Sequence, residues 1–138
     1  MTSKIHYRSG YKYQLAEDFD LKIPVKPTKN IVTQFIDLDT QGNLKIKDGY
    51  AWDGVSGPVI DTESNLRASL VHDALYQLIR NKCLKKSKHK DTADKLFRKL
   101  CKEDGVLSPV AQAYYEVLRK VGHPAADPKN IKKVHTAP

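Results

Sequence analysis

The chain contains little cysteine, with only Cys83 and Cys101 among its 138 residues. Two cysteines cannot build the disulfide framework on which many small secreted proteins depend. They are not spaced as a C-x-x-C pair either, so the sequence does not indicate a zinc site of that kind. We therefore expect Cys101 to lie in the core, Cys83 to be incidental, and both to suit a reducing compartment.

The chain also lacks long apolar runs. No segment approaches the roughly 20 apolar residues that a membrane-spanning helix needs. The N-terminal stretch MTSKIHYRSGYKYQ contains no apolar core of the kind that a signal peptide carries. We therefore expect a protein that does not span a membrane and does not enter the general secretory route.

Charge of one sign predominates, because 24 Lys and Arg residues face 16 Asp and Glu residues and give a formal net charge of +8. Such a balance implies an anionic partner, such as a phospholipid surface, a nucleic acid or an acidic protein. Residues 80–90 hold six of the basic side chains, and this stretch is expected to form a solvated loop. No aromatic residue interrupts it, and no helix-turn-helix, zinc or aromatic-basic motif supports specific binding of nucleic acid.

Residues 1–60 carry short patterns of alternating polar and apolar residues, which are typical of half-buried strands. One pattern contains Tyr11, Tyr13 and Leu15, and the next contains Phe19, Leu21 and Ile23. Two further runs, 31–38 and 44–51, flank the glycine-containing turn 39–43 and predict a hairpin. The expected result is a small antiparallel N-terminal sheet.

Residues 61–122 predict three helices, which makes the fold class α+β within a single domain, 1–122. The first helix is expected from about Glu63 to Arg80, and the second from Asp91 or Thr92 to just before Gly105. The third has Ser108 as its N-cap and ends at Gly122. Its expected core residues are Val110, Ala113, Tyr114, Val117, Leu118 and Val121. Residues 123–138 are expected to form an extended or flexible tail.

Two polar residues are expected on buried helix faces. His72 shares a face of the first helix with Ala68, Leu75, Tyr76 and Ile79, whereas Asp73 points about 100° away. Asp94 lies three residues before Phe97 on the apolar face of the second helix. A buried carboxylate needs a partner, and an imidazole on a facing helix would provide one. A pair of this kind serves structure more often than catalysis, so these two residues alone leave both roles open.

A tight turn precedes the first helix. Residues 50–58, YAWDGVSGP, contain two glycines and a proline, and the backbone carbonyls of such a turn can converge. Hard cations such as Ca²⁺ bind carbonyl and carboxylate oxygens. Asp73 could supply a carboxylate from the helix that follows. Taken alone, however, the segment favours a plain strand-to-helix connection.

Together these features resemble the phospholipase A2 pattern, in which a glycine-rich calcium loop precedes a His-Asp-x-x-Tyr helix and a second helix carries an Asp. The matching residues are Gly54 and Gly57, the segment HDALY at 72–76, and Asp94 within TADKLF at 92–97. The pattern is most similar to the cysteine-free versions in parvovirus capsid proteins. The chain also resembles, over nearly its whole length, a family of small bacteriophage proteins of unknown function. Those proteins share a Tyr-x-Tyr-x-Leu start, an Asp-Gly-x-Ser-x-Pro loop and the His-Asp-x-x-Tyr helix, and the loop here is DGVSGP at 53–58.

The resemblance implies a role for each matching residue. His72 would be the general base, Asp94 would fix its tautomer, and Tyr76 would hold Asp94 by a hydrogen bond. Asp73 would ligate Ca²⁺ together with the backbone carbonyls of Trp52, Gly54 and Ser56. The loop here is poorer in glycine than that of the enzymes, and Asp53 adds a carboxylate that the pattern does not have.

The sequence leaves several functions open. The first is a phage-encoded, phospholipase-A2-like hydrolase of lipid or other esters that docks on an anionic phospholipid surface. The second is a non-catalytic virion, tail or host-interaction protein that keeps the fold and contacts other virion proteins. Either would be located in the host cytoplasm or in the virion. A metal-dependent phosphohydrolase of the His-Asp type would need further ligands, and the remaining histidines do not lie on clear apolar helical faces.

Overall fold

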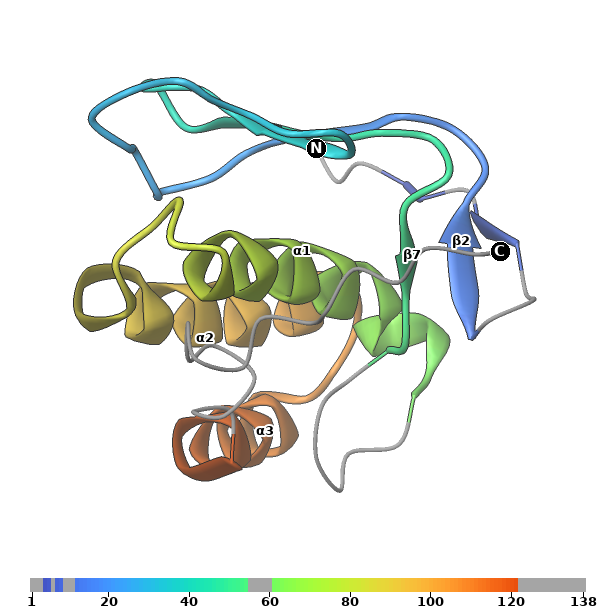
Figure 1. Ribbon diagram of the computed structural model, residues 1–138. Coiled ribbons are helices and arrows are strands. Elements are labelled where there is room, and N and C mark those ends of the chain that lie inside the picture. Colours follow the sequence, from blue (N-terminus) through green and yellow to red (C-terminus); the bar gives the residue numbers. More distant parts are fainter. Residues whose placement is uncertain (1–3, 6, 9–11, 55–60, 122–138) are drawn as a thin grey trace, which may run out of the picture.

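The computed structural model describes residues 4–5, 7–8, 12–54 and 61–121, and it has the predicted α+β arrangement (Figure 1). Strands occupy the first half of the chain and three helices occupy the second. The predicted tail, 123–138, lies outside the described residues, as does Ser56.

The strands form two antiparallel sheets rather than one. The three-stranded sheet has the order β1 (Tyr7–Arg8), β2 (Tyr13–Leu15), β7 (Ala51–Trp52). The four-stranded sheet has the order β3 (Phe19–Lys22), β6 (Asn43–Ile46), β5 (Ile36–Leu38), β4 (Ile31–Val32). Both predicted runs are interrupted: a turn at Thr33 separates β4 from β5, and Gly49, with φ +93°, lies between β6 and β7.

The predicted hairpin is confirmed by the pairing of β5 with β6, in which Leu38 lies opposite Leu44. One carboxylate oxygen of Asp39 accepts hydrogen bonds from the backbone N–H groups of Gln41 and Asn43, each at 2.9 Å. Gly42 has φ +86°, and a side chain there would meet the carbonyl oxygen of Ile23 at 2.3 Å. The turn therefore requires glycine for its backbone angle and for its close packing.

The helices are α1 (Glu63–Arg80), α2 (Lys86–Glu103) and α3 (Ser108–Val121). The bounds of α1 agree with the prediction. The predicted start of α2 at Asp91 or Thr92 is wrong, since the helix begins at Lys86. Much of the basic stretch 80–90 is therefore helical rather than a loop. Ser108 is the first residue of α3 rather than its cap.

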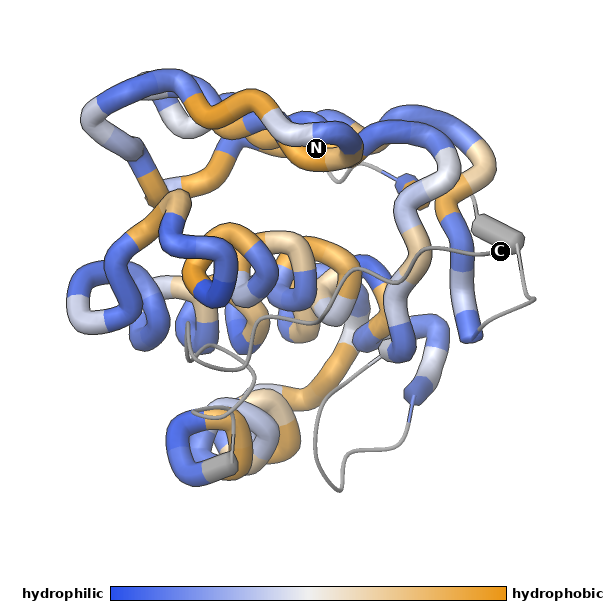
Figure 2. Tube along the Cα trace, viewed as in Figure 1, coloured by the Kyte–Doolittle hydropathy of each residue, from blue (hydrophilic) through white to orange (hydrophobic). Residues whose placement is uncertain are grey.

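In Figure 1 α1 and α2 lie side by side, with the strands on one side of them and α3 on the other. Figure 2 shows hydrophobic segments on the strands and on the part of α1 that faces them. These segments supply fully buried residues such as Leu15, Ile36, Leu75 and Ile79. α1 is thus the central helix, and polar groups on its inner faces must find partners inside the protein.

The prediction for the buried face of α3 is partly wrong. Ala111, Tyr115 and Leu118 are buried, at i, i+4 and i+7 spacing, whereas Val110 is 40% exposed. Ala113 is exposed, Tyr114 and Val117 are half-buried, and the side chain of Val121 is not described. The guanidinium groups of Arg98 and Arg119 lie over the ring of Tyr115, and its hydroxyl donates to Asp91 on α2 at 2.5 Å.

The two thiols lie where the sequence predicts, with Cys101 buried and Cys83 exposed. Within the described ranges, no helix has the length and apolar character needed to cross a bilayer.

Candidate functional site

The packing of α1 against α2 brings His72, Tyr76 and Asp94 together. Nε2 of His72 lies 2.7 Å from Oδ1 of Asp94. The hydroxyl of Tyr76, one turn further along α1, donates to the same carboxylate oxygen at 2.5 Å. The two rings are stacked at a tilt, with their centroids 4.0 Å apart. The sequence predicted these three residues as neighbours, and the structure places them in contact.

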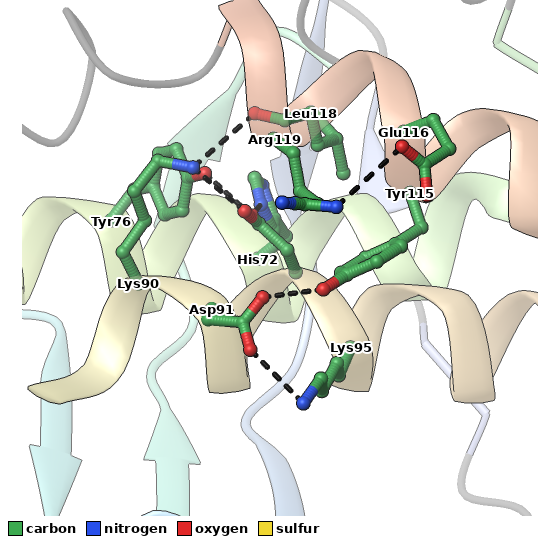
Figure 3. A network of polar contacts seen from close by, with 10 residues as sticks. His72, Tyr76, Lys90, Asp91, Lys95, Tyr115, Glu116, Leu118 and Arg119 are labelled. Carbon is green, nitrogen blue, oxygen red and sulfur yellow. Dashed lines mark hydrogen bonds and ion pairs between the residues drawn. The ribbon is translucent and has the colours of Figure 1, made fainter.

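A fourth residue, Lys90, was missed because its segment was expected to be a loop. Its ammonium group donates to Oδ2 of Asp94 at 2.8 Å and to the backbone carbonyl of Leu118 at 3.3 Å (Figure 3). Lys90 precedes Asp94 by four residues on α2, so both side chains lie on one helix face. That spacing was the available signal, since a carboxylate on an apolar face needs a counter-charge. All three helices therefore contribute to the cluster, which we call the Asp94 network.

The Asp94 network is enclosed. Asp94 is 0% exposed, Tyr76 2%, His72 3% and Lys90 6%. Both oxygens of the carboxylate have partners, since Oδ1 accepts from His72 and Tyr76 and Oδ2 accepts from Lys90. A buried ion pair with all of its hydrogen bonds made is tolerated in a core, whereas an unpaired charge is not.

The protonation states follow from this burial. Burial raises the pKa of Asp94, but hydrogen bonds and positive charges from its partners lower it further, so the net shift is downward. Burial lowers the pKa of His72, and the hydrogen bond to Asp94 offsets this only in part. Near neutral pH the carboxylate is ionised and the imidazole is neutral. Because an ionised carboxylate only accepts, Nε2 carries the ring proton and Nδ1 carries a lone pair.

Nδ1 of His72 is the ring nitrogen that can accept a proton, because Nε2 is bonded to Asp94. Among the described residues, the fully buried side-chain nitrogen and oxygen atoms without a hydrogen bond are Asp37 Oδ1 and Arg67 Nη1. Nδ1 of His72 is not one of them, and no described group is hydrogen-bonded to it. With Nε2 bonded to Asp94, Nδ1 is the ring nitrogen that remains as an acceptor.

Asp73 faces away from the Asp94 network, as its position on α1 predicts. It shares a helix face with Ser69 and Gln77, which contact the strand segment before the glycine turn. The indole N–H of Trp52 lies 2.9 Å from the hydroxyl of Ser69, and the hydroxyl of Tyr50 lies 3.2 Å from the Gln77 side chain. Burial, and after it the charge of Asp73, raises the pKa of Tyr50. Asp73 thus lies against the Tyr50–Trp52 segment.

An acidic residue that was not singled out from the sequence, Asp61, packs against Gly54. Gly54 has φ +82°, and a side chain there would meet the carboxylate of Asp61 at 2.3 Å. Asp61 accepts a hydrogen bond from the hydroxyl of Tyr13 at 3.1 Å. Within the described residues, no three His, Cys, Asp or Glu side chains lie close enough to hold a metal ion. Any cation here would therefore depend on backbone carbonyls in addition to Asp73.

Comparison with known proteins gives one family. The chain matches the family described as "Protein of unknown function (DUF1353)" over residues 31–118, which includes His72, Tyr76, Lys90 and Asp94. No curated protein and no solved structure matched the chain. Because the match covers more than half of the sequence, the chain belongs to this family of proteins of unknown function.

Proposed function

We propose that the protein is a phage-encoded hydrolase of lipid or other esters that resembles phospholipases A2. The observation that carries the proposal is the state of His72. Its ring is neutral, Nε2 is bonded to Asp94 at 2.7 Å, and Nδ1 is free of protein partners among the described residues. An imidazole with one nitrogen fixed and the other accepting is the arrangement of a general base.

In the proposed reaction, Nδ1 of His72 takes a proton from water, and the water oxygen forms a bond to the ester carbonyl carbon. The tetrahedral intermediate then breaks its bond to the alcohol oxygen, and His72 returns the proton to this leaving group. Asp94 stays ionised throughout and stabilises the transient imidazolium. Tyr76 and Lys90 hold Asp94 in place and touch no reacting atom.

Calcium is part of this proposal. Asp73 would hold it together with the backbone carbonyls of Trp52 and Gly54, with Ser56 as a further carbonyl ligand outside the described residues. Support comes from the position of Asp73 against the Tyr50–Trp52 segment, because a carboxylate combined with carbonyl oxygens suits a hard cation. When bound, the ion would supply polarisation of the ester carbonyl.

The partner in this proposal is an anionic phospholipid surface, reached in the host cytoplasm or from the virion. The net charge of +8 supports it, as do the basic side chains along α2. Exposed lysines and arginines attract anionic head groups with an energy that falls as salt rises.

The test is release of fatty acid from vesicles of phosphatidylglycerol and phosphatidylcholine, with Ca²⁺ or with a chelator. We expect release by the wild type in Ca²⁺ and a loss of at least about a hundredfold in His72→Gln, which removes the base. His89→Gln is the matched control, because it changes a histidine of α2 outside the Asp94 network. Circular dichroism of each variant verifies that the fold is kept.

A second candidate is a non-catalytic phage protein that keeps this fold as a virion, tail or host-interaction component. The low exposure of the Asp94 network favours it, since His72 at 3% leaves little room for a substrate carbonyl without local movement. Absence of fatty acid release from the folded wild type would contradict hydrolysis of these phospholipids and favour this role.

A further inference from the structure

A pocket of about 880 Å³ opens between the connection from α1 to α2, the start of α2 and the end of α3. Its charged lining residues are Lys82, Lys85, Lys86, Lys90, Asp91 and Arg119. It lies beside the Asp94 network, because Lys90 belongs to both. The pocket is large enough for a small organic phosphate, and cavities of this volume are typical of ligand sites.

Two of the lysines that line the pocket, Lys82 and Lys85, are not neutralised by a neighbouring carboxylate in the part of the chain that the structure describes. The acidic group of Asp91 is already engaged, by Lys95 at 3.0 Å and by the hydroxyl of Tyr115 at 2.5 Å. Among the described residues, Lys82 and Lys85 have no acidic partner within ion-pair distance. A concave surface on which one sign of charge predominates concentrates its electric field and attracts counter-ions.

Lys85 and Lys86 lie at the N-terminus of α2, where a positive charge destabilises a helix. Lys85 is the N-cap, makes no side-chain cap, and is followed by a first turn without an acidic residue. The N-terminus of a helix carries a partial positive charge, so cations there destabilise it, whereas an anion stabilises it. Lysine at this end of an 18-residue helix is thus unfavourable for the folded protein by itself and becomes favourable when an anion is bound.

Lys82 lines the pocket although its backbone conformation is unfavourable for a residue with a side chain. Its φ of +66° lies in the left-handed region, where it is the one residue other than glycine among those described. A side chain at such a helix end costs about 1 kcal/mol relative to glycine. Backbone strain of this kind often accompanies a functional position. Here it places a cationic side chain in the pocket where glycine would be more stable.

We propose that this pocket binds a phosphate group. The oxygens of a phosphate point in several directions, so it fits donors that arrive from α2, from α3 and from the connection before α2 better than a planar carboxylate does. A lysine is a suitable partner because it binds phosphate as a point charge. The same chemistry is offered by a soluble phosphate ester and by a phospholipid head group. The proposal does not depend on ester hydrolysis.

Binding is measured by calorimetry with glycerol 3-phosphate, and by sedimentation with vesicles of phosphatidylcholine containing phosphatidic acid. Lys82→Gly and Lys85→Gln are each expected to weaken binding about tenfold, as for loss of one charge-assisted contact. Lys99→Gln, on the exposed part of α2 outside the pocket, has the same charge change and is expected to bind within about twofold of the wild type.

The two binding assays either support or contradict a phosphate site in this pocket. Pocket-dependent binding of glycerol 3-phosphate identifies a soluble phosphate ester as a ligand, whereas pocket-dependent binding of vesicles alone identifies the lipid head group. Lys82→Gly should unfold at the same or a higher temperature than the wild type, so its weaker binding cannot come from unfolding. Equal weakening by Lys99→Gln, or wild-type binding by both pocket variants, would overturn the proposal. Failure of the vesicle hydrolysis assay leaves these binding results unaffected.

Discussion

Replacing Lys90 by Met tests whether the Asp94 network is the buried ion pair that the structure describes. The substitution removes an ammonium group 2.8 Å from a carboxylate that is 0% exposed, and also a hydrogen bond to the Leu118 carbonyl. Loss of one partner from a buried pair costs about 3–5 kcal/mol. Asp94 keeps the two hydrogen bonds from His72 and Tyr76, so we expect the lower end, about 3 kcal/mol. For a chain of this size the unfolding temperature should fall by roughly 10 °C.

The same helix offers a matched control. Lys95 pairs with Asp91 at 3.0 Å across one turn, but the two side chains are 56% and 57% exposed. Lys95→Met removes the same charge from α2 and should cost below about 0.5 kcal/mol, as exposed pairs do. Urea unfolding at neutral pH measures both variants. Equal costs for Lys90→Met and Lys95→Met would refute the reasoning.

A double substitution separates charge from packing. Asp94→Asn alone leaves the ammonium of Lys90 without a counter-charge, whereas the two changes together leave no buried charge. We therefore expect the double variant to be more stable than the sum of the single losses predicts, by about 2 kcal/mol. Additive losses would mean that the two groups do not interact in solution.

Three further predictions concern stability. Tyr76→Phe removes a donor to the buried carboxylate at 2.5 Å and should lower the free energy of unfolding by about 2 kcal/mol in urea; an unchanged value would contradict that hydrogen bond. Burial lowers the pKa of His72 below its ordinary 6.5, so the unfolded chain binds the proton more readily. His72 therefore makes its full contribution to the free energy of unfolding above pH 6.5, and this contribution is lost as the pH falls toward the pKa of the folded state. Urea unfolding between pH 7.5 and about 5 should show a smaller decrease in the free energy of unfolding for His72→Gln than for the wild type, and equal decreases would contradict this role of His72. Gly54→Ala would bring a methyl group to 2.3 Å from Asp61 and should lower the unfolding temperature more than Gly49→Ala, whose nearest neighbour is at 3.4 Å; equal shifts would speak against the close packing of Asp61.

The sequence predicted the parts of the fold that depend on local patterns. The hairpin turn at Gly42 and the bounds of α1 follow from turn residues and helical spacing, which act over a few positions. The meeting of His72 with Asp94 was also predictable, because each lies on an apolar face and needs a partner.

The rest depends on contacts between distant segments. The start of α2 was missed because residues 86–90 have no apolar stripe, and the burial of Lys90 is decided by Asp94 and by a carbonyl of α3. The inward face of α3 was misjudged because Tyr115 contacts Arg98 and Asp91 on α2, which the spacing within α3 does not reveal. The division of the strands into two sheets is set by pairing over long separations, such as Tyr13 with Trp52.

The contribution of all three helices to the Asp94 network has a consequence for the order in which the chain is made. His72 and Tyr76 are synthesised first, Lys90 and Asp94 follow on the second helix, and the Leu118 carbonyl that also holds Lys90 comes later on the third. During synthesis Asp94 therefore exists for a time without its full enclosure, in contact with water and with an ordinary affinity for protons. The cluster is completed only by docking of the last helix, so in a nascent chain His72 and Asp94 lack their final surroundings until that step.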